Sequence, residues 1–311
     1  MRLSKPRLQL PLPRRSPRPT ACPTVRGATL QTDSHMKTLK DKVVAITGAG
    51  SGIGRALALD AAKQGASVAI CDRNAAALAE TVALLGAAPH LASLVDVRSD
   101  AEVVAFAAAV AEKFGPAHVI VNNAGVALSH YFDSQSREDF EWVMDINFWG
   151  VVRGTEAFLP QLKTHDDAHI VNISSLFGLV GVPSQSAYNA SKFAVRGLSE
   201  SLRQELHDTP IHVSCVHPGG IDTNIIRNGK HLQGADGKPT TTASLATSFA
   251  RTTSTTPDGA ARIIWAGVLR NRARILIGPE AYAMDLVQRL LPAGYPAVLR
   301  PFLRIFSTKQ R

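Results

Sequence analysis

The stretch TGAGSGIG at residues 47–54 continues the apolar run KVVAIT (42–47) and opens an amphipathic stretch at 52–64. Glycines at such a turn let the backbone approach a phosphate group, and the start of the next helix offers unpaired N–H groups and a positive dipole end. A glycine-rich turn alone is weak evidence, because a tight structural turn has the same composition. Placed between a strand and a helix, it indicates a dinucleotide-binding βαβ unit.

The same alternation of apolar runs and amphipathic stretches continues along the chain. Further strands are predicted at 67–71, 90–96, 118–125, 169–174, 212–218 and 274–278, and helices at 75–85, 99–114, 137–163 and 186–207. The strand runs are short and almost continuously apolar, as expected for strands buried on both faces. The pattern predicts an α/β protein in which helices cover both faces of a doubly wound parallel sheet of about seven strands. No apolar stretch is long enough to predict a transmembrane helix.

Charge and cysteine content exclude several classes of protein. The net charge is +9, of which +6 falls in residues 1–35 and +5 in residues 286–311, leaving −2 for residues 36–285. A central region that is not basic argues against a nucleic-acid-binding fold. The three cysteines (Cys22, Cys71 and Cys215) are too few and too scattered for a disulfide framework or a zinc site, so we expect reduced thiols in a cytoplasmic protein.

The composition divides the chain into three parts. Residues 1–35 are rich in proline and arginine and are predicted to be a disordered extension. This extension arises from a wrongly assigned start codon, is a real basic arm, or is a targeting segment. Residues 36–285 are predicted to form the single dinucleotide-binding catalytic domain. Residues 286–311 form a basic, apolar tail, which either packs on its own subunit or a dimer partner or makes a peripheral membrane contact.

The end of the second predicted strand bears on cofactor choice. Asp72 lies 18 residues after Gly54, near the interval at which an acidic residue binds the adenosine ribose 2′-hydroxyl. A carboxylate there repels the 2′-phosphate of NADP, whereas the adjacent Arg73 can pair with that phosphate. The position of Asp72 directly at the strand end favours NAD, with NADP as the alternative. Asp72 could instead be a solvated residue at the start of the next helix.

The segment YNASK at 188–192 places Tyr188 and Lys192 four residues apart at the start of the helix predicted for 186–207. Residues with this spacing are neighbours on one face of a helix. A lysine beside a tyrosine favours the phenolate and lowers the pKa of the phenol, which makes the pair a candidate acid/base. Taken alone, the pair could equally lie on the surface and touch nothing.

Six motifs in a fixed order resemble the short-chain dehydrogenase/reductase family, in its form of roughly 250 residues. They are TGAGSGIG (47–54), NNAG (122–125), Asn147 in MDINFWG, NISS (172–175), YNASK (188–192) and HPGGIDT (217–223). The resemblance covers about residues 40–280. It implies a Rossmann-like fold in a single domain, an NAD(P)-dependent oxidoreductase acting on CH–OH groups, a small-molecule alcohol or carbonyl substrate and a homo-oligomer.

The resemblance also implies the catalytic residues. Tyr188 would be the general acid/base, and Lys192 would lower its pKa and bind the nicotinamide ribose. Ser175 would orient the substrate oxygen, with Ser174 as the neighbouring alternative. Asn147 would hold a water that links Lys192 to solvent. Metal ligands are not implied, and His130, His169 and His217 lack a second ligand at metal spacing.

The cofactor contacts implied by the resemblance follow the ends of the predicted strands. They are Gly48, Ser51, Gly52, Ile53, Gly54, Asp72, Arg73, Asp96, Val97, Asn123, Ala124, Gly125, Tyr188, Lys192, Pro218, Gly219, Ile221 and Thr223. The asparagines of NNAG could equally be structural residues of a strand-end turn.

The substrate side is predicted from two segments. Residues 224–256 are irregular and rich in Gly, Ser and Thr, which predicts a lid over the nicotinamide end. Leu179, Val180, Val182 and Pro183 would line the opposite side, while Arg227 and Lys230 are the only cations placed to hold an acidic group. We therefore expect a neutral, fairly hydrophobic secondary alcohol or ketone, or a primary alcohol or aldehyde. The alternative function is a catalytically silent regulator that senses dinucleotides, although such a protein needs no Tyr188–Lys192 pair.

Overall fold

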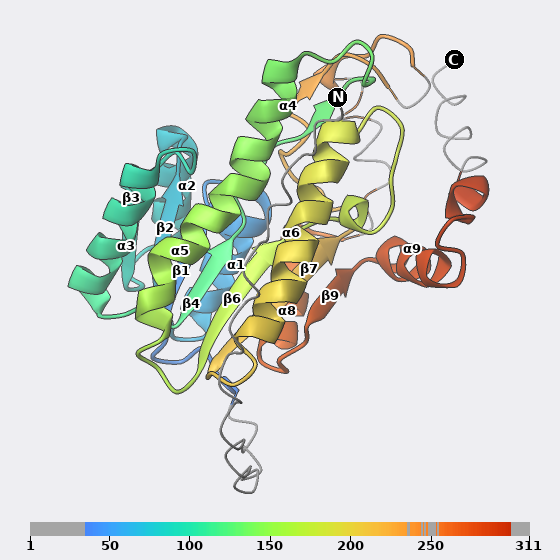
Figure 1. Ribbon diagram of the computed structural model, residues 1–311. Helices are drawn as coiled ribbons and strands as arrows, with labels where there is room; N and C mark the ends of the chain where they lie inside the picture. Colours follow the sequence, from blue (N-terminus) through green and yellow to red (C-terminus); the bar gives the residue numbers. More distant parts are fainter. Residues whose placement is uncertain are drawn as a thin grey trace, which may run out of the picture. The chain divides into compact units, whose positions relative to one another are not determined.

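A seven-stranded parallel sheet forms the centre of the protein (Figure 1). The computed structural model describes residues 35–234, 237–243, 245, 247, 253 and 255–299. The strands lie in the order β3-β2-β1-β4-β6-β7-β9. Their bounds are β1 Val43–Thr47, β2 Ser67–Asp72, β3 His90–Leu94, β4 Val119–Asn122, β6 Ala168–Ile173, β7 Ile211–Pro218 and β9 Arg274–Ile277. Each of the seven predicted strand runs supplies one of these strands, so the predicted fold class is confirmed.

Helices cover the two faces of this sheet in separate layers (Figure 1). One face carries α1 (Gly52–Lys63), α2 (Ala75–Leu85) and α8 (Pro257–Val268), and the other carries α3 (Asp100–Phe114), α5 (Gly150–Leu162) and α6 (Ser186–Glu205). Leu57 and Trp265 belong to the core of the first layer, and Phe106 and Phe158 to that of the second. The Trp265 indole N–H also donates to the Leu57 carbonyl oxygen at 3.2 Å, so its one polar group is satisfied inside the core.

Helix starts follow the sequence closely because short polar residues cap them. Asn74, Ser99, Ser136 and Thr256 each accept a hydrogen bond from a backbone N–H of the first turn, at the starts of α2, α3, α4 (Arg137–Met144) and α8. Such caps satisfy N–H groups that have no partner within the helix. The helix predicted at 137–163 is interrupted, however, by a π-helical turn at Asp145–Trp149 between α4 and α5.

The strand order places a crevice at the carboxyl ends of β1 and β4. These two strands are neighbours, but β1 leads into α1 on one face and β4 leads towards α5 on the other. Chain segments that leave in opposite directions open a gap above the sheet, and ligands of doubly wound proteins bind in such gaps. The glycine turn after β1 and the NNAG segment after β4 therefore meet at the same point.

Part of the predicted lid is tied to the body of the protein. β8 (Lys230–His231) pairs in parallel with β5 (Leu128–Ser129). The His231 Nε2–H donates to the Ile226 carbonyl oxygen (2.7 Å), and its Nδ1 accepts from the Ser129 hydroxyl (3.1 Å). The remainder of the predicted lid is only partly included in the described residues. Near its start, the predicted lid is thus anchored to β5 through β8.

The ends of the chain differ in what the structure describes. Residues 1–34 and 300–311, which hold most of the predicted extension and half of the predicted tail, lie outside the described residues. Helix α9 spans Pro279–Leu290, so the boundary that we predict after residue 285 lies inside this helix. Beyond it, Tyr295 and Leu299 pack on the same chain, against Leu179 and Val180. Within the described part of the chain, every helix is too short or too polar to cross a membrane.

Candidate active site

A cavity of about 640 Å³ lies at the carboxyl ends of β1, β2, β4, β6 and β7. All of the predicted catalytic and cofactor-contact residues line it except Gly54 and Asn147. A second hollow, of about 750 Å³, lies over α4 and α5 and includes none of these residues. The first cavity, where the sequence motifs converge, is therefore the candidate active site.

The glycine turn adopts a backbone shape that few other residues could take. Gly48 and Gly52 have φ of +65° and +56°, which lie in the left-handed region that favours glycine. A Cβ atom on Gly48 would also lie 2.7 Å from the Ala124 Cα, so the turn packs directly on the end of β4. A backbone cradle of this kind, at the start of α1, fits the pyrophosphate of a dinucleotide. Gly54 lies beneath the turn rather than in the cavity wall.

Asn123 and Thr47 hold the glycine turn against the end of β4. The Asn123 amide donates to the carbonyl oxygens of Thr47 and Gly48, both at 2.9 Å. The Thr47 hydroxyl accepts from the backbone N–H groups of Asn123 at 3.0 Å and Ala124 at 3.1 Å. The Asn123 side chain thus fixes the shape of the cavity, although the residue also lines it. Its neighbour Asn122 is buried and bonds to Thr155 and Asn172.

Asp72 lies where an adenosine ribose would meet the end of β2. Its carboxylate accepts from the backbone N–H of Gly50 and from that of Asn74, both at 2.9 Å. These bonds hold the carboxylate at the cavity wall. Arg73 lines the same part of the cavity and lies close enough to Asp96 to lower the pKa of that carboxyl. Asp72, which is expected to favour NAD, and Arg73, which is expected to favour NADP, therefore both line the cavity.

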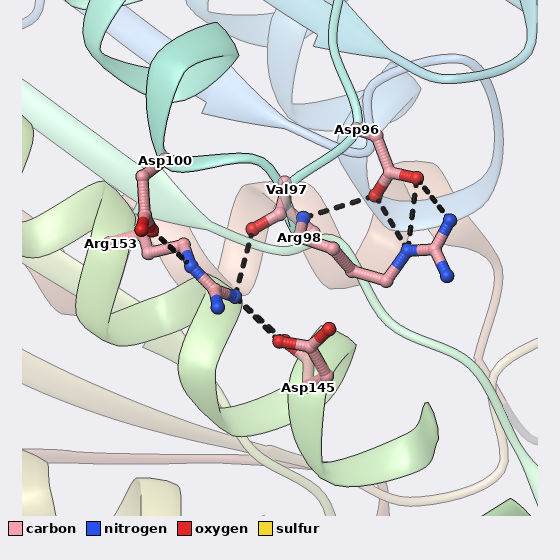
Figure 2. A network of polar contacts seen from close by, with 6 residues as sticks. All are labelled: Asp96, Val97, Arg98, Asp100, Asp145 and Arg153. Atoms are coloured by element: carbon pink, nitrogen blue, oxygen red, sulfur yellow. Dashed lines mark hydrogen bonds and ion pairs between the residues drawn. The ribbon is translucent and has the colours of Figure 1, made fainter. Parts of the chain in front are cut away.

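The loop between β3 and α3 is held by two arginines (Figure 2). Arg98 donates to the Asp96 carboxylate at 2.6–3.1 Å and holds the pKa of this carboxyl below its ordinary value. Arg153, on α5, donates to the Val97 carbonyl oxygen at 3.3 Å and to the Asp145 carboxylate at 2.8 Å. Asp96 and Val97, the residues that we predict to flank an adenine, are thus fixed from both sides.

The predicted catalytic side chains meet deeper in the cavity. Tyr188 is 8% exposed, and the Lys192 Nζ lies 5.7 Å from the centre of its ring. Lys192 is 3% exposed and donates to the Ile173 carbonyl oxygen at 2.9 Å. The Ser175 hydroxyl interacts with the Tyr188 phenol and accepts from the Phe177 N–H at 3.1 Å, whereas the Ser174 hydroxyl donates to the Lys192 carbonyl oxygen at 2.8 Å. Of the two serines, Ser175 is thus the one directed at the tyrosine.

Asn147 lies behind this group. It is fully buried in the π-helical turn, where its side-chain oxygen accepts from the Val126 N–H at 2.8 Å. Its amide nitrogen donates to the Val126 carbonyl oxygen at 2.9 Å and to the Ser191 hydroxyl at 3.1 Å. The side chain therefore supports the cavity wall and the residue next to Lys192, and it does not itself line the cavity.

Burial shifts the pKa of both members of the Tyr188–Lys192 pair. Burial raises the pKa of the Tyr188 phenol, and the hydrogen bond with Ser175 offsets only part of this shift. The expected direction is therefore not the one found in the structure: burial places the pKa of this phenol above its ordinary value, and Lys192 is not among the causes of the shift. Burial also lowers the pKa of Lys192 to about 8, so its ammonium group releases a proton more readily than that of an ordinary lysine.

His217 supports Ser175 from β7. It is fully buried, and its Nδ1 lies 2.9 Å from the Ser175 carbonyl oxygen. Burial lowers the pKa of His217 to about 4, so the ring is neutral near pH 7 and Nδ1–H donates this bond. Within the described residues no group of three or more His, Cys, Asp or Glu side chains is arranged to hold a metal ion. His217 is thus a structural partner of the serine.

Two buried histidines predict that the protein loses stability in mild acid. Burial lowers the pKa from 6.5 to about 3 in His169 and to about 4 in His217. Between these values and 6.5 the unfolded chain binds more protons than the folded one, so stability is full above pH 6.5 and falls as the pH falls. At pH 5 the loss should be about 2 kcal/mol for each histidine.

Urea unfolding of His169→Gln at pH 7.5 and pH 5 measures this effect. The variant should lose about 2 kcal/mol less stability than the wild type on acidification, whatever its stability at pH 7.5. His207→Gln, a change at an exposed histidine, is the matched control and should behave as the wild type. An acid-induced loss that is equal in all three proteins would contradict the prediction.

The far end of the cavity is apolar and lacks the cations considered above. Its wall includes Phe177, Val182, Pro183, Ile225, Ile226 and Leu245. Arg227 and Lys230 do not line it, and Lys230 instead contacts the Asp139 carboxylate and the Trp142 ring. Leu179 and Val180 also do not line it, because they pack outwards against Leu299. The prediction that Leu179 and Val180 line the substrate side of the cavity is therefore wrong.

Three residues that sequence reasoning missed hold the cavity walls. Asn189, directly after Tyr188, donates to the carbonyl oxygens of Phe177 (2.7 Å) and Val180 (2.8 Å). Glu280 and Tyr295 contact the walls from the C-terminal segment. Asn189 could have been found from its place inside YNASK. For the other two the sequence offers no signal, because their partners lie 60 and 114 residues away.

Comparisons with known proteins agree with this geometry. The family model described as "short chain dehydrogenase" matches residues 42–233. SadH of Mycobacterium tuberculosis, named as an oxidoreductase, is 45% identical over 84% of this chain and 94% of its own length. The "CLA biosynthesis dehydrogenase/reductase" of Lactiplantibacillus plantarum is 32% identical over 85% of this chain and 98% of its own length.

Solved structures show the same likeness. A short chain dehydrogenase/reductase from Burkholderia phymatum in complex with NAD has a TM-score of 0.74 and 32% identity, covering 82% of this chain and 95% of that one. The 3-ketoacyl-(acyl-carrier-protein) reductase from Brucella melitensis, complexed with NADH, has a TM-score of 0.68 and 26% identity, covering 78% and 100%.

Proposed function

This chain belongs to the short-chain dehydrogenase/reductase family, and we propose that it moves a hydride between NAD(H) and a neutral, largely apolar secondary alcohol or ketone. It is an oxidoreductase acting on CH–OH or carbonyl groups, with NAD(P) as its cofactor. Primary alcohols and aldehydes are the second substrate class. The observation that carries the proposal is that Ser175, Tyr188 and Lys192 line the same cavity as the glycine turn.

The cofactor half of the cavity fits a dinucleotide. The backbone turn at Gly48–Gly52 would hold its pyrophosphate, and Asp72 the adenosine ribose. Lys192 would hold the nicotinamide ribose. The nicotinamide, when bound, supplies or accepts the hydride. The chain itself has to bind, orient and move a proton at the Tyr188 oxygen.

Proton transfer is the task of Tyr188 in this mechanism. Because burial raises the pKa of its phenol, the group is protonated at neutral pH and can donate to the oxygen of a carbonyl substrate. Ser175 donates a second hydrogen bond to that oxygen and fixes its position. Alcohol oxidation needs the reverse transfer, so it should be favoured as the pH rises.

The substrate class follows from the far end of the cavity. Phe177, Val182, Ile225 and Ile226 form an apolar wall, and the neutral polar side chains beside it include Ser129, Ser184, Gln185, Asn224 and Asn228. Apolar walls favour apolar ligands, and the lack of a cation in the described part of this wall disfavours carboxylates and phosphates. A neutral carbonyl compound with a hydrophobic body meets both conditions.

A panel of alcohols and carbonyls of increasing apolar size tests this function. Turnover is followed by the absorbance of NADH and NADPH, in parallel with carboxylated analogues of the same size. Neutral members should react with higher kcat/KM than their charged analogues. Binding of NADH with no turnover of any member would instead favour a catalytically silent dinucleotide sensor.

We further propose a cytoplasmic homo-oligomer. Cys71 and Cys215 are free and buried, as suits a reducing compartment. Trp149, in the π-helical turn, and Phe193, on α6, are 50% and 39% exposed. Such large exposed apolar side chains suit a contact between subunits. Sedimentation velocity that returned the mass of a single chain at micromolar concentration would contradict the oligomer.

Peripheral membrane contact is proposed for the C-terminal side of the protein. Leu286, Leu290 and Leu291, on and after α9, are 57%, 70% and 46% exposed. The chain from residue 286 onwards carries five Arg or Lys and no acid. An exposed apolar stripe followed by basic sequence suits the surface of an anionic bilayer.

Vesicle co-sedimentation measures this contact. The protein should sediment with phosphatidylserine-containing vesicles at low salt and be released as salt screens the charges. Leu286→Ser with Leu290→Ser should weaken binding several-fold, since it removes apolar area without changing the charge. An absence of binding at low salt would leave packing on the protein itself as the role of the tail.

A further inference from the structure

The C-terminal segment, residues 279–299, contacts both loops that border the cavity. It consists of α9 and the residues that follow it to Leu299. The family model ends at residue 233, before this segment begins. One of its contacts is with the loop at residues 177–183, on the substrate side. The other is with the Gly219–Gly220 turn after β7, on the nicotinamide side.

Tyr295 completes the hydrogen bonding of the substrate-side loop. The buried Asn189 side chain accepts from the Val182 N–H at 3.1 Å, besides donating to the Phe177 and Val180 carbonyl oxygens. The Gly181 N–H points to the other side, where the Tyr295 hydroxyl accepts from it at 3.0 Å. The loop is therefore held between a residue adjacent to the catalytic tyrosine and a residue of the C-terminal segment.

Apolar packing reinforces this contact. Leu179 and Val180, each 1% exposed, form a cluster with Leu299, which is 8% exposed, and Tyr295 packs against this cluster. Val182 packs against the same cluster and, with Pro183, also lines the cavity. The C-terminal segment thus packs directly on a loop that forms part of the cavity wall.

Glu280 makes the corresponding contact on the nicotinamide side. Its carboxylate accepts from the Gly220 N–H at 2.6 Å and lines the cavity. A Cβ atom on Gly219 would lie 2.6 Å from the Glu280 Cδ, so the carboxylate occupies the space that a side chain there would need. The turn is therefore packed directly on the Glu280 side chain.

The segment that carries these two residues is itself fixed to the sheet. Asp285, 8% exposed, accepts from Arg274 of β9 at 2.6 Å and from Arg289 of α9 at 2.8 Å. Arg274 also donates to Glu200 of α6 at 2.9 Å. Helix α9 is therefore tied to the same helix that carries Tyr188 and Lys192.

We propose that the C-terminal segment sets the width of the active site, with Tyr295 positioning the substrate-side loop and Glu280 positioning the Gly219–Gly220 turn. The proposal rests on the proposed function for the identity of the ligands. Tyr295 is a positioning residue for the substrate, since it reaches the cavity only through Gly181 and its neighbours. Glu280 positions the turn that we predict to lie along the nicotinamide.

Tyr295→Phe tests the first half. The ring stays in the apolar cluster, and only the acceptor for Gly181 is lost. Hydrogen exchange at Gly181 should accelerate about 2- to 10-fold. KM for the best neutral substrate should rise by a similar factor, while kcat and the NADH dissociation constant stay within twofold of the wild type.

Tyr282→Phe is the matched control, because it removes a hydroxyl from a half-exposed tyrosine of the same C-terminal segment. It should change neither exchange at Gly181 nor KM. Equal behaviour of Tyr295→Phe and Tyr282→Phe in both measurements would overturn the role of Tyr295. So would a Gly181 amide that exchanges as fast as an unprotected amide in the wild type.

Glu280→Leu and Glu280→Gln test the second half by the fluorescence of bound NADH. Glutamine keeps an acceptor for Gly220 and should bind NADH within twofold of the wild type. Leucine removes the acceptor and should weaken binding about 2- to 10-fold or more. Equal NADH affinity of both variants and the wild type would overturn the role of Glu280, and weaker binding by the glutamine variant alone would do the same.

These measurements separate the present proposal from the proposed function. Amide exchange and NADH binding need no turnover, so they report on positioning even if no alcohol or carbonyl reacts. If melting shows Glu280→Leu to be unfolded, Glu280→Ala replaces it with the same expected loss. An enzyme that is active on the panel, yet shows no response to either residue, would contradict the positioning role alone.

Discussion

Replacing Tyr188 with phenylalanine is expected to lower kcat by at least about 10²-fold, because the group proposed to exchange a proton with the substrate oxygen is lost. The ring that packs beside Phe177 stays in place. Binding of NADH, followed by its fluorescence, should remain within a few-fold of the wild type. The rate is measured with the best neutral substrate from the panel, in both directions.

The matched control is again Tyr282→Phe, which should keep the wild-type rate. A Ser175→Ala variant should be impaired at the same step, since it removes the hydrogen-bond partner of the phenol. If folded Tyr188→Phe turned over at a near-normal rate, the mechanism with Tyr188 as acid/base would be wrong.

Removing the charge of Asp72 is expected to change cofactor preference by about tenfold or more, because a like-charge contact with the 2′-phosphate of NADP would disappear. The wild type should show the higher kcat/KM with NADH. In Asp72→Asn the preference should move towards NADPH, since Arg73 remains beside the site. The asparagine keeps an oxygen that can accept from the Gly50 N–H, which now bonds to the carboxylate at 2.9 Å.

A second variant separates charge from shape. Asp72→Ser also loses the charge but cannot reach Gly50 equally well, so it should bind both dinucleotides more weakly and still favour NADPH relative to the wild type. Arg73→Ala in the Asp72→Asn background should cancel the gain with NADPH. A wild-type preference for NADPH would assign the deciding role to Arg73 instead of Asp72.

The sheet and the cofactor side could be predicted because their signals are local. Each buried strand is a short apolar run, and the turns after β1, β4 and β7 carry their own motifs. The interruption at Asp145–Trp149 could not be predicted, since DINFW fits an ordinary helix equally well. Within this turn, Asn147 bonds to Val126 and Ser191, which are distant in sequence, so no local pattern reveals these contacts.

The substrate side was predicted only in part for the same reason. Leu179 and Val180 have the same apolar character as Val182, and nothing in the loop sequence tells which of them faces the cavity. Their direction depends on Leu299 and Tyr295, more than 100 residues further along the chain. The direction of the Tyr188 pKa shift was missed because it depends on burial, which spacing alone does not reveal.

The contacts of Tyr295 and Glu280 also have a consequence for the order of events during synthesis. Proteins are made from the N-terminus, and the glycine turn, the catalytic serine and the tyrosine all leave the ribosome before residues 279–299. Neither loop beside the cavity can gain its contact with the C-terminal segment until that segment has emerged. A nascent chain can thus contain the residues proposed to bind a dinucleotide before the two loops beside its cavity have made their contacts with residues 279–299. Proteolytic removal of residues 279–299 from the folded protein would likewise leave both loops without these contacts.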